Sequence, residues 1–101
     1  MIVVYFTTET EEEAEKISKK LVEEKLVACA NYFPIKSIYW WKGEVQRGKE
    51  VAVLLKTQEK NFEKIVKRIK ELHSYDLPVI EKFDVKTYPE VEKWVKDSTK
   101  S

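Results

Sequence analysis

The sequence is short of cysteine, histidine, glycine and long apolar runs. Cys29 and His73 are each the only residue of their type, which excludes an intrachain disulfide and a thiolate zinc cluster within one copy. No run approaches the ~18 apolar residues that a membrane span needs. An excess of charge is also missing, because 19 basic residues face 18 acidic ones and leave a net charge of +1. A surface dedicated to polyanions such as nucleic acid is therefore not expected.

Charged residues are abundant, at 37% of the chain, and lysine and glutamate provide most of them. With few amide side chains, this composition is typical of a thermostable protein. The length of 101 residues predicts a single domain over 1–101. The apolar start at 1–6 has no basic segment before it, so we interpret it as a strand and not as a signal peptide. We expect a cytoplasmic protein.

The hydrophobic pattern predicts the order strand, helix, strand, strand, helix, strand and a short C-terminal helix. Apolar runs suggest strands at 2–6, 26–32, 35–41, 51–55 and 79–85, of which 26–32 and 35–41 are one strand interrupted by Pro34. A capping box at Thr8 or Thr10 precedes an apolar helical stripe formed by Ala14, Ile17, Leu21 and Val22. A tight turn is expected at Lys42-Gly43. These elements predict an α+β, ferredoxin-like βαββαβ sandwich with both main helices on one face of the sheet.

The segment 38–41 and the run 51–55 carry large apolar side chains on both faces of a strand. Two helices can cover only one face of a sheet. Burying one surplus tryptophan is worth roughly 4–6 kcal/mol as an upper limit. One alternative is that the C-terminal helix folds back over the open face. We favour a homotrimer in which Tyr39, Trp40 and Trp41 dominate the contacts between copies.

Several segments together resemble the CutA divalent-cation tolerance family. They are Ala28-Cys29-Ala30-Asn31, Ser37-Ile38-Tyr39-Trp40-Trp41-Lys42-Gly43, Glu50 before the apolar run that ends in Lys56-Thr57, and His73-Ser74-Tyr75-Asp76-Leu77-Pro78. The resemblance extends over essentially the whole chain. It implies a tight trimer with an architecture like that of the PII signalling proteins, and a role in tolerance of copper and other divalent metals.

The sequence departs from the family at the positions of the copper ligands proposed in bacterial relatives. Those ligands, a thiol and two adjacent histidines, fall here on Phe6, Leu72 and His73, so one of the three remains. No metal or other cofactor is required on this interpretation. We expect Cu(II) or another divalent cation to bind weakly, at micromolar affinity or looser, and we expect this binding to depend on His73.

His73 and Cys29 each allow a structural and a functional interpretation. His73 is either a partly buried histidine at a helix C-terminus or a metal ligand. Cys29 is either a small hydrophobic residue in a strand or a ligand or redox group. Glu50 and Lys56, expected at the two ends of the third strand, are either solvated or interface charges, or they line an intersubunit cleft with Cys29, His73 and Tyr75. Such a cleft would bind a small anion or a metal complex.

Three functions compete on this fold. The first is a non-enzymatic trimeric binding protein for a metal or small ligand, with PII-like signalling or small-anion sensing as an alternative. The second, an RNA-binding module, is disfavoured because Glu50–Leu54 contains no aromatic residue for base stacking. The third, an acylphosphatase-like enzyme, lacks a phosphate cradle, because acidic residues follow the first strand at 9–13. We therefore predict no enzymatic activity, no nucleic-acid partner and no membrane partner.

Overall fold

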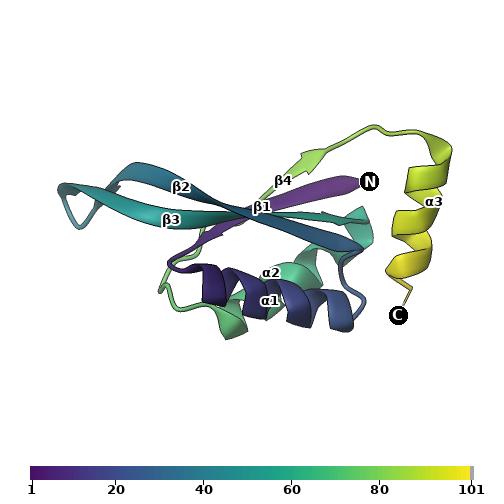
Figure 1. The fold of residues 1–101 in the computed structure, drawn as a ribbon, viewed down its shortest axis with the longest axis horizontal. Helices are drawn as coiled ribbons and strands as arrows, with labels where there is room; N and C mark the ends of the chain where they lie inside the picture. The colour runs from purple at the N-terminus through teal and green to yellow at the C-terminus, as the bar shows by residue number, and fades with distance from the viewer. Residues whose placement is uncertain (101) are drawn as a thin grey trace.

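The computed structural model describes residues 1–100 and confirms the predicted ferredoxin-like βαββαβ order followed by a C-terminal helix. The elements are β1 (Ile2–Thr8), α1 (Glu11–Glu23), β2 (Cys29–Trp41), β3 (Glu44–Thr57), a short 3-10 turn (Glu59–Asn61), α2 (Phe62–Leu72), β4 (Glu81–Asp84) and α3 (Pro89–Ser98). The strands form one antiparallel sheet in the order β2-β3-β1-β4. Helices α1 and α2 cover one face of it (Figure 1). We call the opposite face the open face.

The core lies between the sheet and the two helices. Alternate residues of β1 point into it, with Ile2, Val4 and Phe6 essentially without exposure. The other residues of β1 are only half-buried because no helix covers the open face. In α1, Thr10 is the N-cap and its hydroxyl accepts a hydrogen bond from the Glu13 amide, which decides between the two capping positions.

Strand β2 was predicted to break at Pro34, and that prediction was wrong. The strand runs without interruption from Cys29 to Trp41, with Pro34 in register opposite Val51 of β3. Because β2 is the edge of the sheet, one side of the strand makes no backbone hydrogen bonds to a neighbouring strand. A proline, which has no N–H, can therefore be accommodated there.

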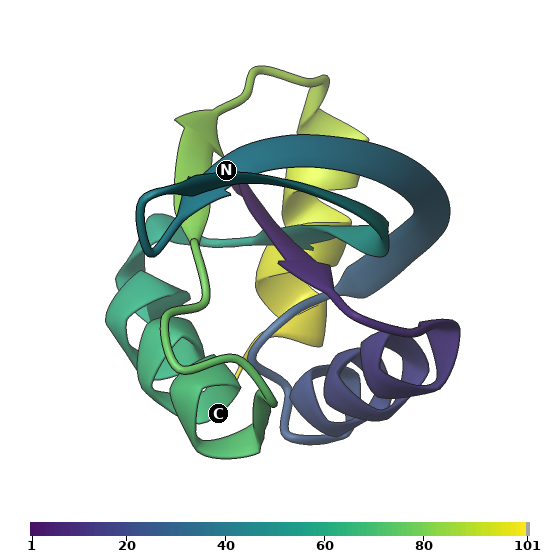
Figure 2. The ribbon, with the colours of Figure 1, turned by 90° about the vertical axis from the view of Figure 1, so that its left-hand side faces the viewer.

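Strands β2 and β3 form a long hairpin that projects beyond the body of the molecule (Figure 1). Ile38 and Trp40 lie on the same face of the sheet as the core residues. They are nevertheless 70% and 73% exposed, because α1 and α2 do not extend under this part of the hairpin (Figure 1). Figure 2 shows how strongly the hairpin curls over the sheet. The projecting hairpin explains the long dimension of the molecule, 45 Å against 25 Å and 21 Å.

Helix α3 packs against the far end of the sheet and does not close the open face (Figures 1 and 2). It is held there by buried Val95 and by a hydrogen bond of 2.6 Å from the Gln58 amide group to the Thr99 hydroxyl. The alternative in which this helix covers the surplus apolar residues is therefore excluded. No helix among residues 1–100 is long and apolar enough to cross a membrane.

Candidate functional site

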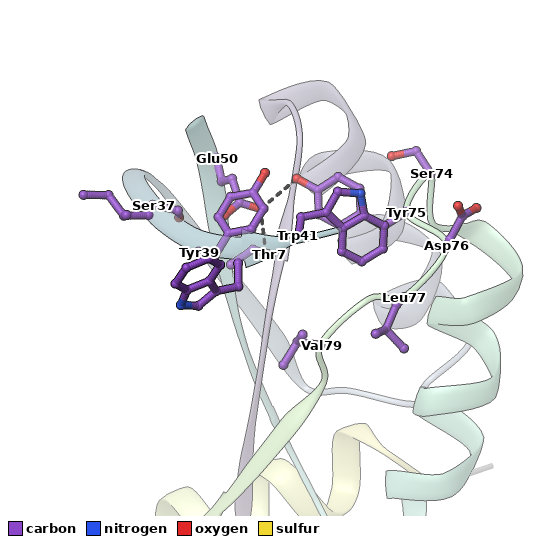
Figure 3. Close-up of a pocket in the computed structure, with 12 residues that line it drawn as sticks. Thr7, Ser37, Tyr39, Trp41, Glu50, Ser74, Tyr75, Asp76, Leu77 and Val79 are labelled. Carbon is purple, nitrogen blue, oxygen red and sulfur yellow. Dashed lines mark hydrogen bonds between the residues drawn. The ribbon is translucent and has the colours of Figure 1, made fainter. Parts of the chain in front are cut away.

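A carboxylate and two hydroxyl groups meet where the hairpin leaves the body of the sheet. Glu50 lies in the middle of β3, not at its end as the sequence suggested, and its side chain faces the open side. Its Oε2 atom accepts hydrogen bonds from the Tyr75 hydroxyl at 2.7 Å and the Thr7 hydroxyl at 3.0 Å (Figure 3). These three residues come from β3, the segment after α2 and the end of β1.

The charge on Glu50 is favoured by these neighbours. Burial alone would raise the pKa of the Glu50 carboxyl, but hydrogen bonds from Ser37, Tyr75 and Thr7 hold that pKa below its ordinary value. Burial, and then the hydrogen bond to Glu50, raise the pKa of the Tyr75 hydroxyl far above its ordinary value. Tyr75 therefore remains a hydrogen-bond donor to an ionised carboxylate.

His73 holds Tyr75 in place. Its side chain is fully buried, and its Nε2 atom lies 2.7 Å from the Thr7 carbonyl oxygen, to which it donates. Its Nδ1 atom accepts a hydrogen bond of 3.0 Å from the Tyr75 amide. Both ring nitrogens are thus occupied, in the tautomer protonated on Nε2. The prediction that His73 is a metal ligand remains a prediction, but a metal would have to displace one of these hydrogen bonds.

Helix α1 supports the same segment through Glu13. The Glu13 carboxylate accepts a hydrogen bond of 2.7 Å from the Ser74 amide and lies 3.8 Å from Nδ1 of His73. Burial opposes ionisation of Glu13, yet the hydrogen bonds from Ser74 and Glu9 lower its pKa. The segment that carries Tyr75 is therefore fixed from two sides, by β1 and by α1.

A pocket of about 670 Å³ opens beside this cluster. The hairpin and the segment that follows α2 form its walls (Figure 3). Its lining comprises Thr7, Ser37, Ile38, Tyr39, Trp40, Trp41, Glu50, Ser74, Tyr75, Asp76, Leu77 and Val79. Of the predicted cleft residues, the structure brings Glu50 and Tyr75 together here with the hairpin aromatics, and it places His73 directly behind Tyr75.

Cys29 and Lys56 lie elsewhere in the chain. They face each other in register on β2 and β3, on the open face, at the end opposite the pocket. Lys56 is six positions from Glu50 along β3, roughly 20 Å at the usual rise of a strand. Lys56 Nζ has an amide oxygen of Asn31 as a partner at 3.4 Å. A cleft with all five predicted residues is thus not formed within one copy.

Sequence reasoning missed Thr7, Ser37 and Asp76 as pocket residues. Thr7 and Ser37 carry short hydroxyl side chains that have no signature of their own, and only the register of the sheet brings them to Glu50. Among the described residues, no cluster of three or more His, Cys, Asp or Glu side chains could hold a metal ion.

Comparison with known proteins gives one consistent answer. The sequence model described as CutA1 divalent ion tolerance protein matches residues 2–98. The chain belongs to the CutA1 family. It is similar to the divalent-cation tolerance protein CutA of Pyrococcus horikoshii, with 46% identity over 101 residues and 99% of each chain covered. The corresponding protein of Thermotoga maritima is 40% identical over 99 residues, which cover 97% of this chain and 98% of that one.

Solved CutA1 structures have the same fold. A crystal structure of a point mutant of CutA1 from Pyrococcus horikoshii matches with a TM-score of 0.97 at 44% identity, covering all of both chains. A structure from Archaeoglobus fulgidus matches with a TM-score of 0.96 at 36% identity, covering 99% of this chain and 100% of that one. That relative is described as a periplasmic divalent cation tolerance protein. The cytoplasmic location expected from the sequence thus remains a prediction.

Proposed function

We propose that this CutA1-family protein acts as a non-enzymatic homotrimer in the tolerance of divalent cations, copper among them. The family assignment supports the role in divalent-cation tolerance. The observation that supports assembly is the exposed aromatic hairpin. Ile38, Tyr39, Trp40 and Trp41 are all more than 40% exposed on a strand whose outer edge is free. Contact with other copies would bury this stripe and pair the edge.

The metal would bind weakly, at sites to which more than one copy contributes. The basis for this is the lack of a cluster of metal-ligating side chains within residues 1–100 and the occupied ring nitrogens of His73. Cys29, half-buried on the open face, is the one thiol that another copy could approach. A soft thiolate donor favours copper over calcium or magnesium.

The absence of enzymatic activity is part of the same proposal. Cys29 lies in register with Lys56, which in turn faces Val3 of β1, whereas His73 bonds the carbonyl of Thr7. Cys29 and His73 are thus far apart, because the path from Val3 to Thr7 along β1 alone measures roughly 13 Å. A thiol and an imidazole at that separation form no nucleophile–base pair.

Small-anion sensing, the alternative from the sequence, has less support. The pocket beside Glu50 is lined by no lysine, arginine or histidine, and Lys56 lies at the other end of the open face. An anion would thus meet the Glu50 carboxylate without a compensating cation from the same copy.

Native mass spectrometry with and without Cu(II) tests the proposal. We expect an assembly of three times the 12.0 kDa chain mass, together with partial occupancy by copper at micromolar concentrations. A species of 12.0 kDa at micromolar protein would contradict the trimer. A trimer that retains no copper at a hundred micromolar would contradict direct metal binding while leaving the assembly intact.

A further inference from the structure

The pocket beside Glu50 carries acidic charge with no basic side chain in its walls. Its twelve lining residues include two carboxylates, Glu50 and Asp76, and none is lysine, arginine or histidine. In a chain with slightly more basic than acidic residues, this separation of charge is not an average property of the surface. The pocket is therefore suited to a cation.

Glu50 is the centre of that charge, and its own copy provides it with no counter-ion. The hydroxyls of Thr7 and Tyr75 solvate Oε2, but they are neutral. The ion pairs within residues 1–100 involve other carboxylates, namely Glu13, Glu24, Glu59, Glu92 and Asp97. A half-buried ionised carboxylate that is hydrogen-bonded but unpaired gains free energy from a cation placed beside it.

The remaining walls are aromatic. Tyr39, Trp40, Trp41 and Tyr75 line the same pocket as the carboxylates, and the indole side chains are the largest of them. The face of an aromatic ring attracts a cation within about 6 Å, with a gain of roughly 0.5–2 kcal/mol per contact. Lys42 already makes such a contact with Trp41, its Nζ atom lying 5.9 Å from the ring centroid.

The aromatic walls distinguish an organic cation from a metal ion. A hydrated divalent metal seeks several oxygen, nitrogen or sulfur ligands and gains little from indole rings. An alkylammonium group combines a charge for Glu50 with methylene groups for the apolar walls, which include Leu77 and Val79. The volume of about 670 Å³ leaves room for an aliphatic chain of several carbons.

We propose that this pocket binds the ammonium group of an organic amine, with Glu50 as its counter-ion and the indole rings of Trp40 and Trp41 as its walls. The ammonium group has two sources. It belongs to a free aliphatic amine or to Lys56 of a second copy, since Lys56 lies on the open face without a carboxylate partner in its own copy. The site does not depend on metal binding, so the two proposals can fail separately.

The test is a titration of the assembled protein with n-butylammonium chloride, followed by tryptophan fluorescence. A Trp94→Phe background removes the indole outside the pocket, so the signal comes from Trp40 and Trp41. We expect saturable binding that is at least tenfold weaker for 1-butanol and absent for sodium butyrate. These two ligands keep four carbons and replace the ammonium group by a neutral hydroxyl or an anionic carboxylate, so the comparison needs no further variant.

A pair of variants then locates the charge. Glu50→Gln keeps the size and hydrogen-bonding capacity of the side chain and should weaken n-butylammonium binding at least tenfold. Glu15→Gln removes a carboxylate from the exposed face of α1 and should leave binding unchanged. Equal binding of butylammonium and butyrate, or equal binding by Glu50→Gln and its parent, would overturn the proposal.

Lys56→Ala distinguishes the two sources. If Lys56 of a second copy fills the pocket, its removal should tighten n-butylammonium binding at least threefold. If the ligand is a free amine, the affinity for n-butylammonium should change less than twofold. Either result supports an ammonium-binding site in the pocket. An absence of n-butylammonium binding in both the parent and Lys56→Ala would overturn the proposal, whatever the result of the copper experiments.

Discussion

One imidazole joins three parts of the chain. His73 donates to the Thr7 carbonyl of β1, accepts from the Tyr75 amide and lies against Glu13 of α1. We expect His73→Ala to reduce the free energy of unfolding by about 2–4 kcal/mol, because two partly buried polar groups lose their partners and a cavity forms at the buried imidazole. Denaturant unfolding monitored by circular dichroism measures this. A loss below about 0.5 kcal/mol would show that solvent replaces the imidazole without penalty.

Copper titration gives His73 a second test. Because both of its nitrogens are occupied, we now expect wild type and His73→Ala to bind Cu(II) with affinities within about twofold, at micromolar affinity or looser. Isothermal titration calorimetry at fixed pH compares the two. An affinity that falls tenfold or more in the variant would restore His73 as a ligand, in agreement with the sequence-based prediction. Nanomolar binding in both would indicate a site formed by other residues.

The lowered pKa of Glu50 has a consequence for acid stability. A carboxyl whose pKa is lower in the folded protein than in the unfolded chain, where the ordinary value is 4.5, stabilises the fold above that value. This contribution is lost as the pH falls through the folded-state pKa. We expect the melting temperature of wild type to fall more steeply below about pH 4.5 than that of Glu50→Gln. Glu15→Gln is the matched control and should follow wild type.

At the scale of elements, the turn at the tip of the hairpin requires a left-handed backbone conformation that is unfavourable for Lys42, its first central residue. Lys42 and Gly43 both have positive φ, 50° and 79°, which is the pattern of a type I′ turn. Asparagine adopts this conformation more readily than lysine. We expect Lys42→Asn to stabilise the protein by about 0.5 kcal/mol and Gly43→Ala to destabilise it by about 1 kcal/mol. Thermal unfolding of both variants checks the signs, and a stabilising Gly43→Ala would contradict the turn assignment.

The elements were largely predictable because each has a local cause. The apolar runs, the capping residue Thr10 and the Lys42-Gly43 turn are signals within a few residues of the structure they specify. The predicted interruption at Pro34 was wrong because the effect of a proline depends on whether its strand is at the edge of the sheet. That is a property of the whole sheet and not of the local sequence. Val22, expected on the buried stripe of α1, is 41% exposed, and Ser18 is buried with the other three predicted residues in its place.

The site was only partly predictable for a similar reason. Glu50 and Tyr75 could be named from the resemblance to a family, but their contact joins positions 25 residues apart in sequence. It depends on the β1–β3 register and on the path of the chain after α2, and neither has a local signal. Lys56 was grouped with Glu50 because both are charged and lie on β3, but the length of that strand separates them.

At the scale of the whole molecule, the aromatic hairpin should determine assembly. We expect Trp41→Ala to weaken the trimer, because each copy would lose a large apolar contact worth several kcal/mol. Analytical ultracentrifugation over a dilution series measures the dissociation. Trp94→Ala is the matched control, since Trp94 is similarly exposed, 46% against 41%, but lies on α3 away from the hairpin. A trimer equally stable in Trp41→Ala and wild type would remove Trp41 as an anchor.

Because the hairpin extends past α1 and α2, the residues that stabilise the fold of one copy differ from those available for contact between copies. The residues that form the core of one copy lie between the sheet and its helices, whereas Ile38–Trp41 lie outside that core and are exposed in the single chain. Substitutions in the projecting half can therefore change which chains associate without disturbing the core of either. In a cell with two such proteins, the identity of the partner would be encoded in this hairpin. Transplanting it would transfer self-recognition from one chain to the other.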